Sequence, residues 1–267
     1  MWKIKCNIWS FLSYNYNGDK MFKIGDVVTR ISHNNDVLFK IYDIKDDIAY
    51  LKGIDVRLCA DSTLDDLVIE NNIIIDNRSF YNQIKDLRKF ERNDYFYIPG
   101  KILHIDGDRD YLNRCLAFYK KANVLAYGIY SPEEEMAKNI EKYLDDIKPD
   151  IVVITGHDSE IIKNSKYFAD AVKVCRKFQK DYDKLIVIAG ACQSDYDKLI
   201  KSGANFASSP KKINIHALDP SIIALSLSLS DKNKEVDLLS LLDKTSCGKD
   251  GMGGVSTKGV MTTGYPR

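Results

Sequence analysis

Between residues 97 and 209 the chain alternates short, uniformly apolar runs with longer amphipathic stretches. Runs such as IVVIT and LIVIA show no alternation of apolar and polar positions, which is typical of strands buried on both faces of a parallel sheet. The stretches between such runs, for example 132–148 and 165–181, repeat apolar residues at helical spacing. Alternating strands and helices predict an α/β domain with a mostly parallel sheet that is flanked by helices. In such sheets the chemistry gathers beyond the carboxyl ends of the strands.

Residues 22–58 carry a different pattern. Apolar and polar positions alternate in FKIGDVVTR, VLFKIYDI and IAYLKGIDVRL, and Gly, Asn and Asp punctuate them. Several short strands within about 40 residues predict a small SH3-like β-barrel. Residues 61–95 are charged and poor in glycine, which indicates a linker with one amphipathic helix.

These patterns divide the chain into five segments. We expect an N-terminal extension at 1–20, an SH3-like β-barrel at 21–60, a linker with a helix at 61–95, an α/β domain at 96–245 and a Gly-rich tail at 246–267. The tail shows no clear period, so we expect it to be exposed. Its basic residues Lys249 and Lys258 make it a candidate segment for self-cleavage or inhibition.

The composition narrows the class of protein. Lys and Arg number 39 against 38 Asp and Glu, so the net charge is +1, and neither nucleic acid nor an anionic membrane is expected as the main partner. No apolar run approaches the ~20 residues that cross a bilayer, and the start of the chain lacks a signal-peptide pattern. The six cysteines include no CxxC pair, which argues against a zinc ribbon or a redox dithiol. We therefore expect a cytoplasmic protein with reduced thiols.

Two strands end in residues that suit nucleophilic catalysis. The run DIVVI leads to His157, and the run LIVIA leads to Cys192. The 35 residues between them suffice for one helix and one strand, so both side chains are expected at the same edge of the sheet. An imidazole beside a thiol raises its reactivity and can give a proton to a departing amine. A helix expected directly after Cys192 favours both a thiolate and an oxyanion.

The acidic pair Asp106 and Asp108, which follows the run ILHI, leaves another interpretation open. Paired carboxylates at a strand end suit Mg²⁺ or phosphate chemistry, and Cys192 is then a core residue. The same two residues could instead cap the following helix or form an acidic wall for a basic substrate residue. His104, inside the strand, is expected to be structural. We expect no metal and no cofactor.

The paired His and Cys blocks resemble the caspase–gingipain–separase clan of cysteine peptidases. Within it, VITGHD, NSKYF, IAGACQS, GANFASSPK, NIHALDP and DGMGGVSTKGV together resemble the YabG family of sporulation-specific peptidases, and the resemblance runs from Met21 to the tail. It implies a caspase-like sheet and a cysteine endopeptidase whose catalytic residues are His157 and Cys192. It also implies processing of spore coat and related spore proteins near Arg, and self-cleavage.

The resemblance carries further expectations. Protein substrates are the implied partners, the location is the cytoplasm of the sporulating cell or the spore coat, and a homo-oligomer stays open. The amides of Cys192 and Asp158 are the expected oxyanion donors, although Gly156 precedes the histidine where the clan places a Gly after it. Only Ser159 to Lys163 separate GHD from NSKYF, a shorter loop than in the family.

Cleavage near Arg requires a carboxylate, because a guanidinium is best held by a bidentate anion. The candidates for this role are Asp158, Asp195 and Asp219, and Ser208 is expected to line the cleft. Two alternatives to the peptidase stay open: a non-catalytic scaffold of spore assembly, and a phosphate- or metal-binding α/β domain that uses Asp106 and Asp108.

Overall fold

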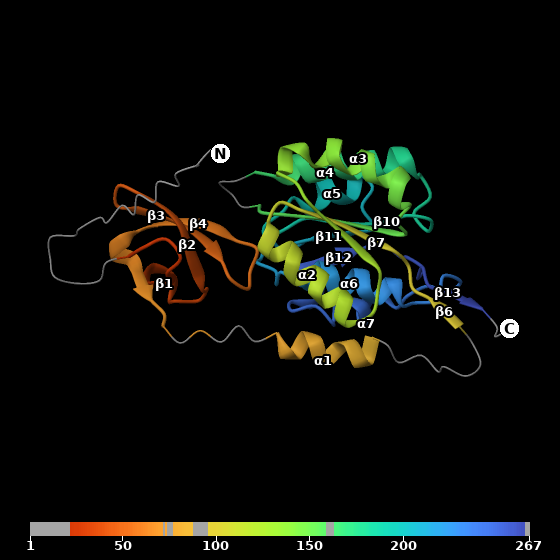
Figure 1. Cartoon of the computed structure of the whole chain (residues 1–267), viewed down its shortest axis with the longest axis horizontal. Coiled ribbons are helices and arrows are strands. Elements are labelled where there is room, and N and C mark those ends of the chain that lie inside the picture. Colours follow the sequence, from red (N-terminus) through yellow and green to blue (C-terminus); the bar gives the residue numbers. More distant parts are fainter. Residues whose placement is uncertain (1–21, 72, 74–76, 88–95, 159–162, 265–267) are drawn as a thin grey trace, which may run out of the picture. The chain divides into compact units, whose positions relative to one another are not determined.

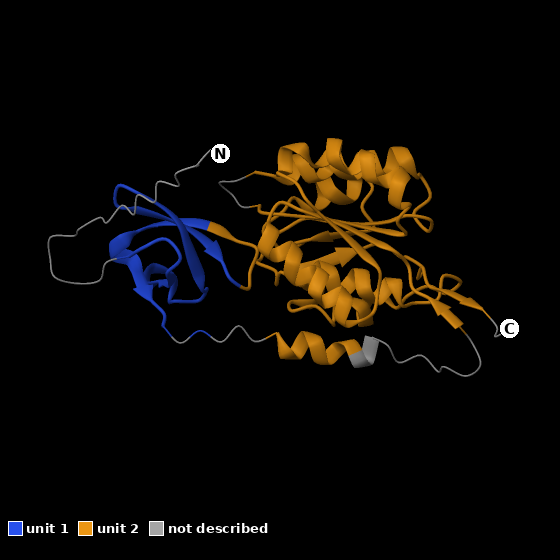
Figure 2. Ribbon diagram, in the orientation of Figure 1, with its two compact units in different colours: residues 1–54, 60–73 blue, residues 55–59, 74–267 orange. Residues whose placement is uncertain are grey.

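The computed structural model describes residues 22–71, 73, 77–87, 96–158 and 163–264. The expected extension at 1–20 and most of the short loop after Asp158 lie outside these residues. The chain divides into two compact units. Unit 1 comprises the residues up to Ile54 together with Ala60–Ile73, and unit 2 comprises Asp55–Cys59 and the chain from Ile74 onward (Figure 2).

Unit 1 is built on a five-stranded sheet with the order β4-β3-β2-β1-β5. Its strands are β1 (Val27–Arg30), β2 (Phe39–Lys45), β3 (Ile48–Gly53), β4 (Cys59–Thr63) and β5 (Leu67–Ile69). The alternating positions of β2 and β3 explain the sheet, because Phe39, Ile41, Ala49 and Leu51 all point into the core and are fully buried. An antiparallel sheet therefore stands where the sequence predicts an SH3-like β-barrel. Its last strand, β5, lies within the stretch that the sequence pattern assigns to a linker.

Unit 2 contains a six-stranded sheet with the order β12-β11-β10-β9-β7-β8. Its strands are β7 (Ile102–Asp106), β8 (Ala126–Tyr130), β9 (Ile151–Thr155), β10 (Ile186–Ala189), β11 (Phe206–Ser208) and β12 (Met252–Gly254). All neighbours from β8 to β11 pair in parallel, and β12 joins antiparallel to β11. A further ribbon pairs β6 (Phe96–Ile98) with β13 (Thr262–Gly264). The predicted α/β class and the mostly parallel sheet are confirmed.

Helices cover both faces of this sheet (Figure 1). One face carries α3 (Met136–Ile147), α4 (Ser165–Phe178) and α5 (Tyr196–Lys201), and the other carries α2 (Arg109–Lys121), α6 (Asp219–Ser228) and α7 (Leu238–Leu242). The remaining helices are α1 (Arg78–Leu87) and α8 (Gly248–Gly251). Every residue of α6 is buried, including Asp219 and the three serines that lie among its apolar residues. No helix in the described part of the chain is long and apolar enough to cross a membrane.

The strand order fixes where a ligand site can form. The chain passes from β7 to β8 on one side of β7, and then to β9 on the other side, so the winding reverses between β7 and β9. A crevice opens at the carboxyl ends of the strands at such a reversal, because the connecting helices leave on opposite faces. Asp106 ends β7, Asp108 follows it at the start of α2, and His157 follows β9.

The C-terminal segment differs from the exposed tail expected from its composition. Met252 is fully buried, and β12 completes the edge of the main sheet. Its glycines permit this packing: a Cβ at Gly253 would lie 2.8 Å from Tyr196 Oη, and one at Gly254 would lie 2.4 Å from Phe206 Cδ1. Glycines that look like flexible linker residues in the sequence are therefore places where neighbouring atoms approach the backbone closely.

Candidate active site

His157 lies directly beyond β9 and is held by the end of the neighbouring strand. Its Nε2 is 3.0 Å from Asp108 Oδ2. The other oxygen of Asp108 accepts hydrogen bonds from the amides of Asp110 and Tyr111, at 2.8 and 3.1 Å, and thereby caps α2. The capping role foreseen for Asp108 is confirmed. One carboxylate therefore both begins the helix and orients the imidazole.

The surroundings keep the His157 ring charged. Burial lowers its pKa, but the hydrogen bond to Asp108 and the nearby Cys59 side chain outweigh burial and raise the pKa to about 10. Nδ1 is buried and has no hydrogen-bond partner among the described residues. The His157 amide donates to Glu133 Oε1 at 3.0 Å, which fixes the loop. At neutral pH the residue is thus an imidazolium that Asp108 orients, with the Cys59 side chain beside its ring.

Cys192 lies beyond β10, the strand that pairs in parallel with β9. It follows Gly190, whose φ of +115° suits glycine, and it is fully buried. Sγ accepts the Ile215 N–H at 3.3 Å and lies 3.6 Å from the Ile215 carbonyl oxygen. Burial raises the pKa of the thiol to about 12, although the backbone N–H groups of Ile215 and Arg57 oppose this. In this state of the molecule Cys192 is a neutral thiol.

Tyr111 connects the two halves of the site. Its ring centroid lies 5.4 Å from that of His157. Burial raises the Tyr111 pKa, and the charges of Asp108, Cys59 and Cys192 raise it further while Arg57 opposes them. The Tyr111 ring therefore packs beside the imidazole, and the Cys192 thiol lies near enough to influence the pKa of the phenol.

The carboxylates proposed to hold a substrate arginine are occupied by the chain itself. Asp158 is buried and accepts hydrogen bonds from the Asn164 amide at 2.8 Å, the Ser194 hydroxyl at 2.9 Å and the Ser165 hydroxyl. Asp195 caps α5. These contacts join the loop after β9 to the start of α5.

The remaining two candidates are also enclosed. Asp219 is fully buried and accepts from the amides of His216 and Ser246, at 2.9 and 2.8 Å. Burial raises its pKa, and these hydrogen bonds oppose the rise. The hydroxyl of Ser208 is buried beside Gly190 without a hydrogen-bond partner among the described residues.

Asp106 sits at the centre of a buried polar network. It is fully buried, and its Oδ2 accepts from Arg57 Nη1 at 2.7 Å and from the Thr155 hydroxyl at 2.8 Å, while Oδ1 accepts from the Asp108 amide at 2.9 Å. Burial raises its pKa, but the Arg57 charge and the His104 hydrogen bond lower it to about 2. Among the described residues no three His, Cys, Asp or Glu side chains gather as metal ligands would. The cation beside Asp106 is an arginine.

His104 has the structural place expected of it. It is fully buried, its Nε2 lies 2.8 Å from Thr155 Oγ1, and its Nδ1 lies 3.1 Å from the Tyr119 hydroxyl. Burial lowers the pKa of the ring. It supports the strand end that presents Asp106.

Arg57 is the residue that sequence reasoning missed. It comes from the short connection between β3 and β4, yet it is fully buried in unit 2. Its Nε and Nη2 donate to the Ala217 carbonyl at 3.2 and 3.0 Å, and its guanidinium lies 4.8 Å from the Tyr111 ring centroid. Nothing in the local sequence DVRLC marks this arginine, because its partners lie 49 and 160 residues away.

Comparison with known proteins decides the family. A family model described as YabG peptidase U57 matches residues 23–86 and 70–266. The chain belongs to the YabG peptidase U57 family. The sporulation-specific protease YabG of Bacillus subtilis (strain 168) is 38% identical over 284 residues, which cover 92% of this chain and 98% of that protein. The resemblance to a family of sporulation proteases is therefore confirmed.

A solved structure titled as an ABC transporter permease from the Pseudomonas fluorescens group overlaps 49% of this chain and 31% of its own. The TM-score is 0.32 and the identity 16%, values too low to indicate a shared overall fold. The YabG family match, which spans almost the entire described chain, identifies this protein as a protease.

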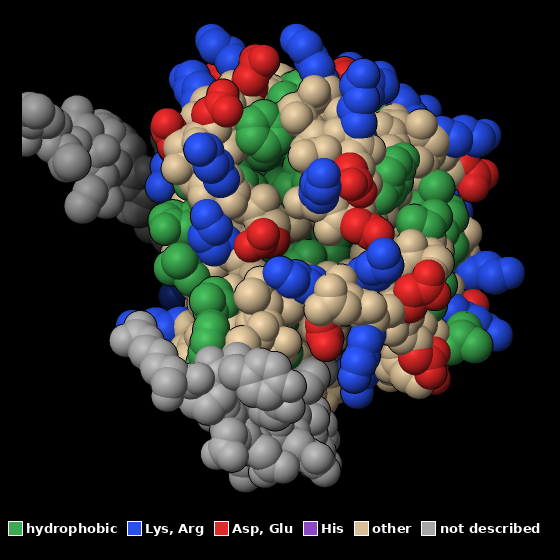
Figure 3. Space-filling view, turned by 90° about the vertical axis from the view of Figure 1, so that its right-hand side faces the viewer, with side chains coloured by type: hydrophobic (Ala, Val, Ile, Leu, Met, Phe, Trp, Pro, Cys, Tyr) green, Lys and Arg blue, Asp and Glu red, His purple; other side chains and the backbone are tan. Residues whose placement is uncertain are grey.

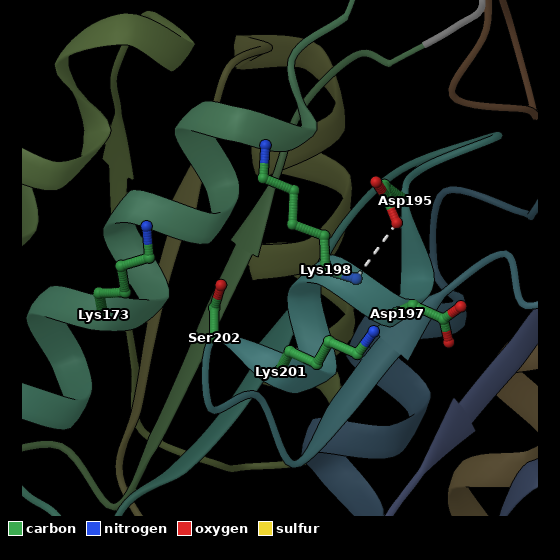
Figure 4. A pocket seen from close by; sticks show the side chains of 6 residues that line it. All are labelled: Lys173, Asp195, Asp197, Lys198, Lys201 and Ser202. Atoms are coloured by element: carbon green, nitrogen blue, oxygen red, sulfur yellow. Dashed lines mark hydrogen bonds between the residues drawn. The ribbon is translucent and has the colours of Figure 1, made fainter.

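A groove of this YabG-family chain is lined by the residues that follow His157 and Cys192, although neither of these two side chains lines it. It has a volume of about 790 Å³, and Asp158 and Gln193, the residues that follow His157 and Cys192, both line it. The groove is lined by Asp158, Lys163, Ser165, Lys166, Gln193, Asp195, Lys198 and Lys212. A second depression of about 450 Å³ shares Asp195 and Lys198 with it, and Figure 4 shows the Asp195 carboxylate bonded to the Lys198 amide there. Basic and acidic side chains are also interspersed on the face shown in Figure 3.

Proposed function

We propose that this chain is a cysteine endopeptidase that cleaves spore coat and related spore proteins next to Arg, and that it also cleaves itself. The observation that carries the proposal is the placement of Cys192 and His157 beyond two adjacent parallel strands, with Asp108 3.0 Å from His157. Membership of a sporulation protease family supports the proposal. The α/β domain at 96–245 bears the chemistry.

The proposed reaction begins with the thiol. Cys192 loses its proton to water once its surroundings are hydrated, because burial is the main cause of its raised pKa and the nearby Arg57 cation favours a thiolate. Sγ attacks the scissile carbonyl carbon, and the backbone N–H groups of Cys192 and Asp158 stabilise the oxyanion. His157 then gives its proton to the departing amine. Water hydrolyses the thioester, and the now neutral His157 accepts the proton from that water.

Asp108 has a defined role in this reaction. The Asp108 carboxylate accepts a hydrogen bond from His157 Nε2, so Nδ1 of His157 is the nitrogen that exchanges protons with the substrate. It also keeps the imidazolium populated at neutral pH, which suits an acid that protonates an amine. The protein acts in the cytoplasm of the sporulating cell or in the spore coat, where its substrates are made and assembled.

The test uses a fluorogenic peptide amide with Arg before the scissile bond, together with a purified spore coat protein. The wild type is expected to cleave both, whereas Cys192→Ala and His157→Ala should lose at least 100-fold in kcat/KM. Cys175→Ala is the matched control, because Cys175 is equally buried but packs in the core on the opposite face of the sheet. Equal cleavage by wild type and Cys192→Ala would show that another group performs the chemistry. A substrate with Lys in place of Arg that reacts equally well would refute the Arg preference.

A further inference from the structure

Residues 55–59 lie in unit 2 as an extended segment, although they connect two strands of unit 1 (Figure 2). Val56 forms an antiparallel bridge with His216, and the Ala217 amide donates to the Asp55 carbonyl at 2.9 Å. On the other side the Tyr111 hydroxyl donates to the Val56 carbonyl at 2.8 Å. The segment is therefore held through its backbone on both sides.

The side chain of Arg57 fills a closed pocket. Its guanidinium meets the Asp106 carboxylate at 2.7 Å, the Ala217 carbonyl at 3.0 and 3.2 Å, and the face of the Tyr111 ring at 4.8 Å. An anion, a carbonyl and an aromatic face are the partners that distinguish arginine from lysine. The pocket lies at the reversal of strand order, between the ends of β7 and β9, where ligands of such sheets bind.

The same segment passes the two candidate catalytic side chains. Ile215, which contacts the Cys192 thiol, immediately precedes His216 in the bridge to Val56. Burial raises the pKa of Cys192, and the Arg57 backbone N–H opposes it, so the amide of Arg57 faces Sγ. The carbonyl carbon of Arg57 is two covalent bonds from that nitrogen, at about 2.5 Å. Cys59, two residues further along, lies beside the His157 ring.

We propose that residues 55–59 lie where an extended substrate of this peptidase binds. In this arrangement Arg57 fills the pocket that recognises a substrate arginine, Asp106 is the recognising carboxylate, and the Arg57–Leu58 peptide bond is the site of self-cleavage. The inference rests on the proposed cysteine-peptidase function and gives that function an internal substrate and a specificity residue.

Every atom in the proposed self-cleavage comes from side chains and backbone of this chain and from water. Water that reaches the thiol takes the Cys192 proton, because His157 is already protonated. Sγ then forms a bond to the carbonyl carbon of Arg57, the bond to the Leu58 nitrogen breaks, and His157 gives that nitrogen its proton. Water then hydrolyses the thioester, His157 takes back a proton, and Arg57 ends in a carboxylate. Before the cut the segment covers the thiol and excludes other substrates. After the cut its new ends are free to leave the pocket around Arg57.

A purely structural arginine makes a different prediction, because it neither marks a cut nor controls access to Cys192. The first experiment therefore incubates the full-length protein and identifies new termini by intact mass and N-terminal sequencing. We expect one fragment that begins at Leu58 and one that ends at Arg57. Cys192→Ala and Arg57→Ala should both abolish this cut, whereas Arg30→Ala, an arginine of β1, should keep it. A cut elsewhere, for example in the basic C-terminal segment, overturns the inference.

The assay of an Arg peptide in trans separates the two proposals. If the wild type cleaves the peptide but its own chain stays intact, the peptidase function stands and the internal substrate is refuted. If the protein cleaves neither the peptide nor its own chain, the peptidase function fails. The accessibility of the Cys192 thiol to a labelling reagent then still decides whether residues 55–59 cover it. That second measurement needs no activity.

Access is measured in a His157→Ala background, in which the chain cannot cut itself. Iodoacetamide labels the native protein, and mass spectrometry follows each cysteine. Adding Arg57→Ala is expected to speed the labelling of Cys192 at least tenfold and to leave buried Cys175 protected. If Cys175 also becomes labelled, the Arg57→Ala variant has unfolded. Arg57→Lys, which keeps the charge beside Asp106, is then used in its place, and it should speed the labelling of Cys192 by a smaller factor. Unchanged labelling of Cys192 in a folded variant overturns the inference.

Discussion

Replacing Asp108 by Asn removes the negative charge that lies beside the His157 ring. Helix α2 keeps a capping side chain, because Asn and Asp cap helices about equally well. The His157 pKa of about 10 lies roughly 3.5 units above its ordinary value, which corresponds to about 5 kcal/mol in favour of the imidazolium. Asp108 is the largest favourable contributor. We therefore expect Asp108→Asn to lower the pKa of His157 by about 1–3 units.

The consequence appears on the alkaline side of the pH profile. A raised pKa means that the charge of His157 contributes stability fully below pH 6.5, and that this contribution and the proton donor are lost as the pH rises through 10. A fall of two units leaves roughly one tenth of the acid at pH 9, so kcat/KM for an Arg peptide amide should fall about tenfold there. An Arg nitrophenyl ester, whose leaving group needs no proton, should lose much less.

The assay compares the amide and the ester from pH 6 to 10 for the wild type, Asp108→Asn and Asp195→Asn. Asp195 also caps a helix, α5, so its variant controls for loss of a capping carboxylate. The reasoning is refuted if the alkaline limb of Asp108→Asn coincides with that of the wild type, or if Asp195→Asn moves the limb by the same amount.

Three further changes have defined outcomes. The Asp106 pKa of about 2 lies below its ordinary 3.8, so the pair with Arg57 contributes about 2 kcal/mol of stability, which is fully present above pH 3.8 and is lost as the pH falls toward 2. Asp106→Asn leaves a buried cation unpaired, so it should lower the free energy of unfolding, measured in urea at pH 6, by about 3–5 kcal/mol. A loss under 1 kcal/mol contradicts this. Gly190→Ala forces a φ of +115° on alanine and brings its Cβ to 3.0 Å from Ser208, so thermal unfolding should show a cost of about 1–3 kcal/mol, and an unchanged Tm speaks against it. Ser208→Ala removes a buried hydroxyl that has no partner among the described residues, so it should be neutral or stabilising by up to about 1 kcal/mol in the same assay, and clear destabilisation argues for an unseen partner.

Much of the fold could be predicted because its strands are uniformly apolar. Runs such as IVVIT can be satisfied only inside a sheet covered on both faces, and the glycines that follow them leave room for reactive side chains. The positions of His157 and Cys192 beyond adjacent strands follow from the length of one crossover. The capping role of Asp108 is also local and could be recognised from the residues that follow it.

The remaining features depend on contacts between distant parts of the chain. The pairing of Asp108 with His157 requires β7 to lie beside β9, and local pattern does not give strand order. The sequence pattern assigns the connection that contains Arg57 to the predicted β-barrel. The pocket around its side chain is formed by β7, α2 and the loop before α6. Strand β12 has two glycines in three residues, so it lacks the alternation of apolar and polar residues that predicts a strand.

The central claim is that Cys192 is the nucleophile of an Arg-directed site. An arginyl peptide chloromethyl ketone tests it most directly, because it alkylates the thiol or imidazole beside which its arginine binds. Peptide mass spectrometry should locate the adduct on Cys192, and a competing Arg peptide should slow its formation. An adduct confined to Cys59 or Cys247, or one that forms equally fast with the matching lysyl reagent, would contradict the account.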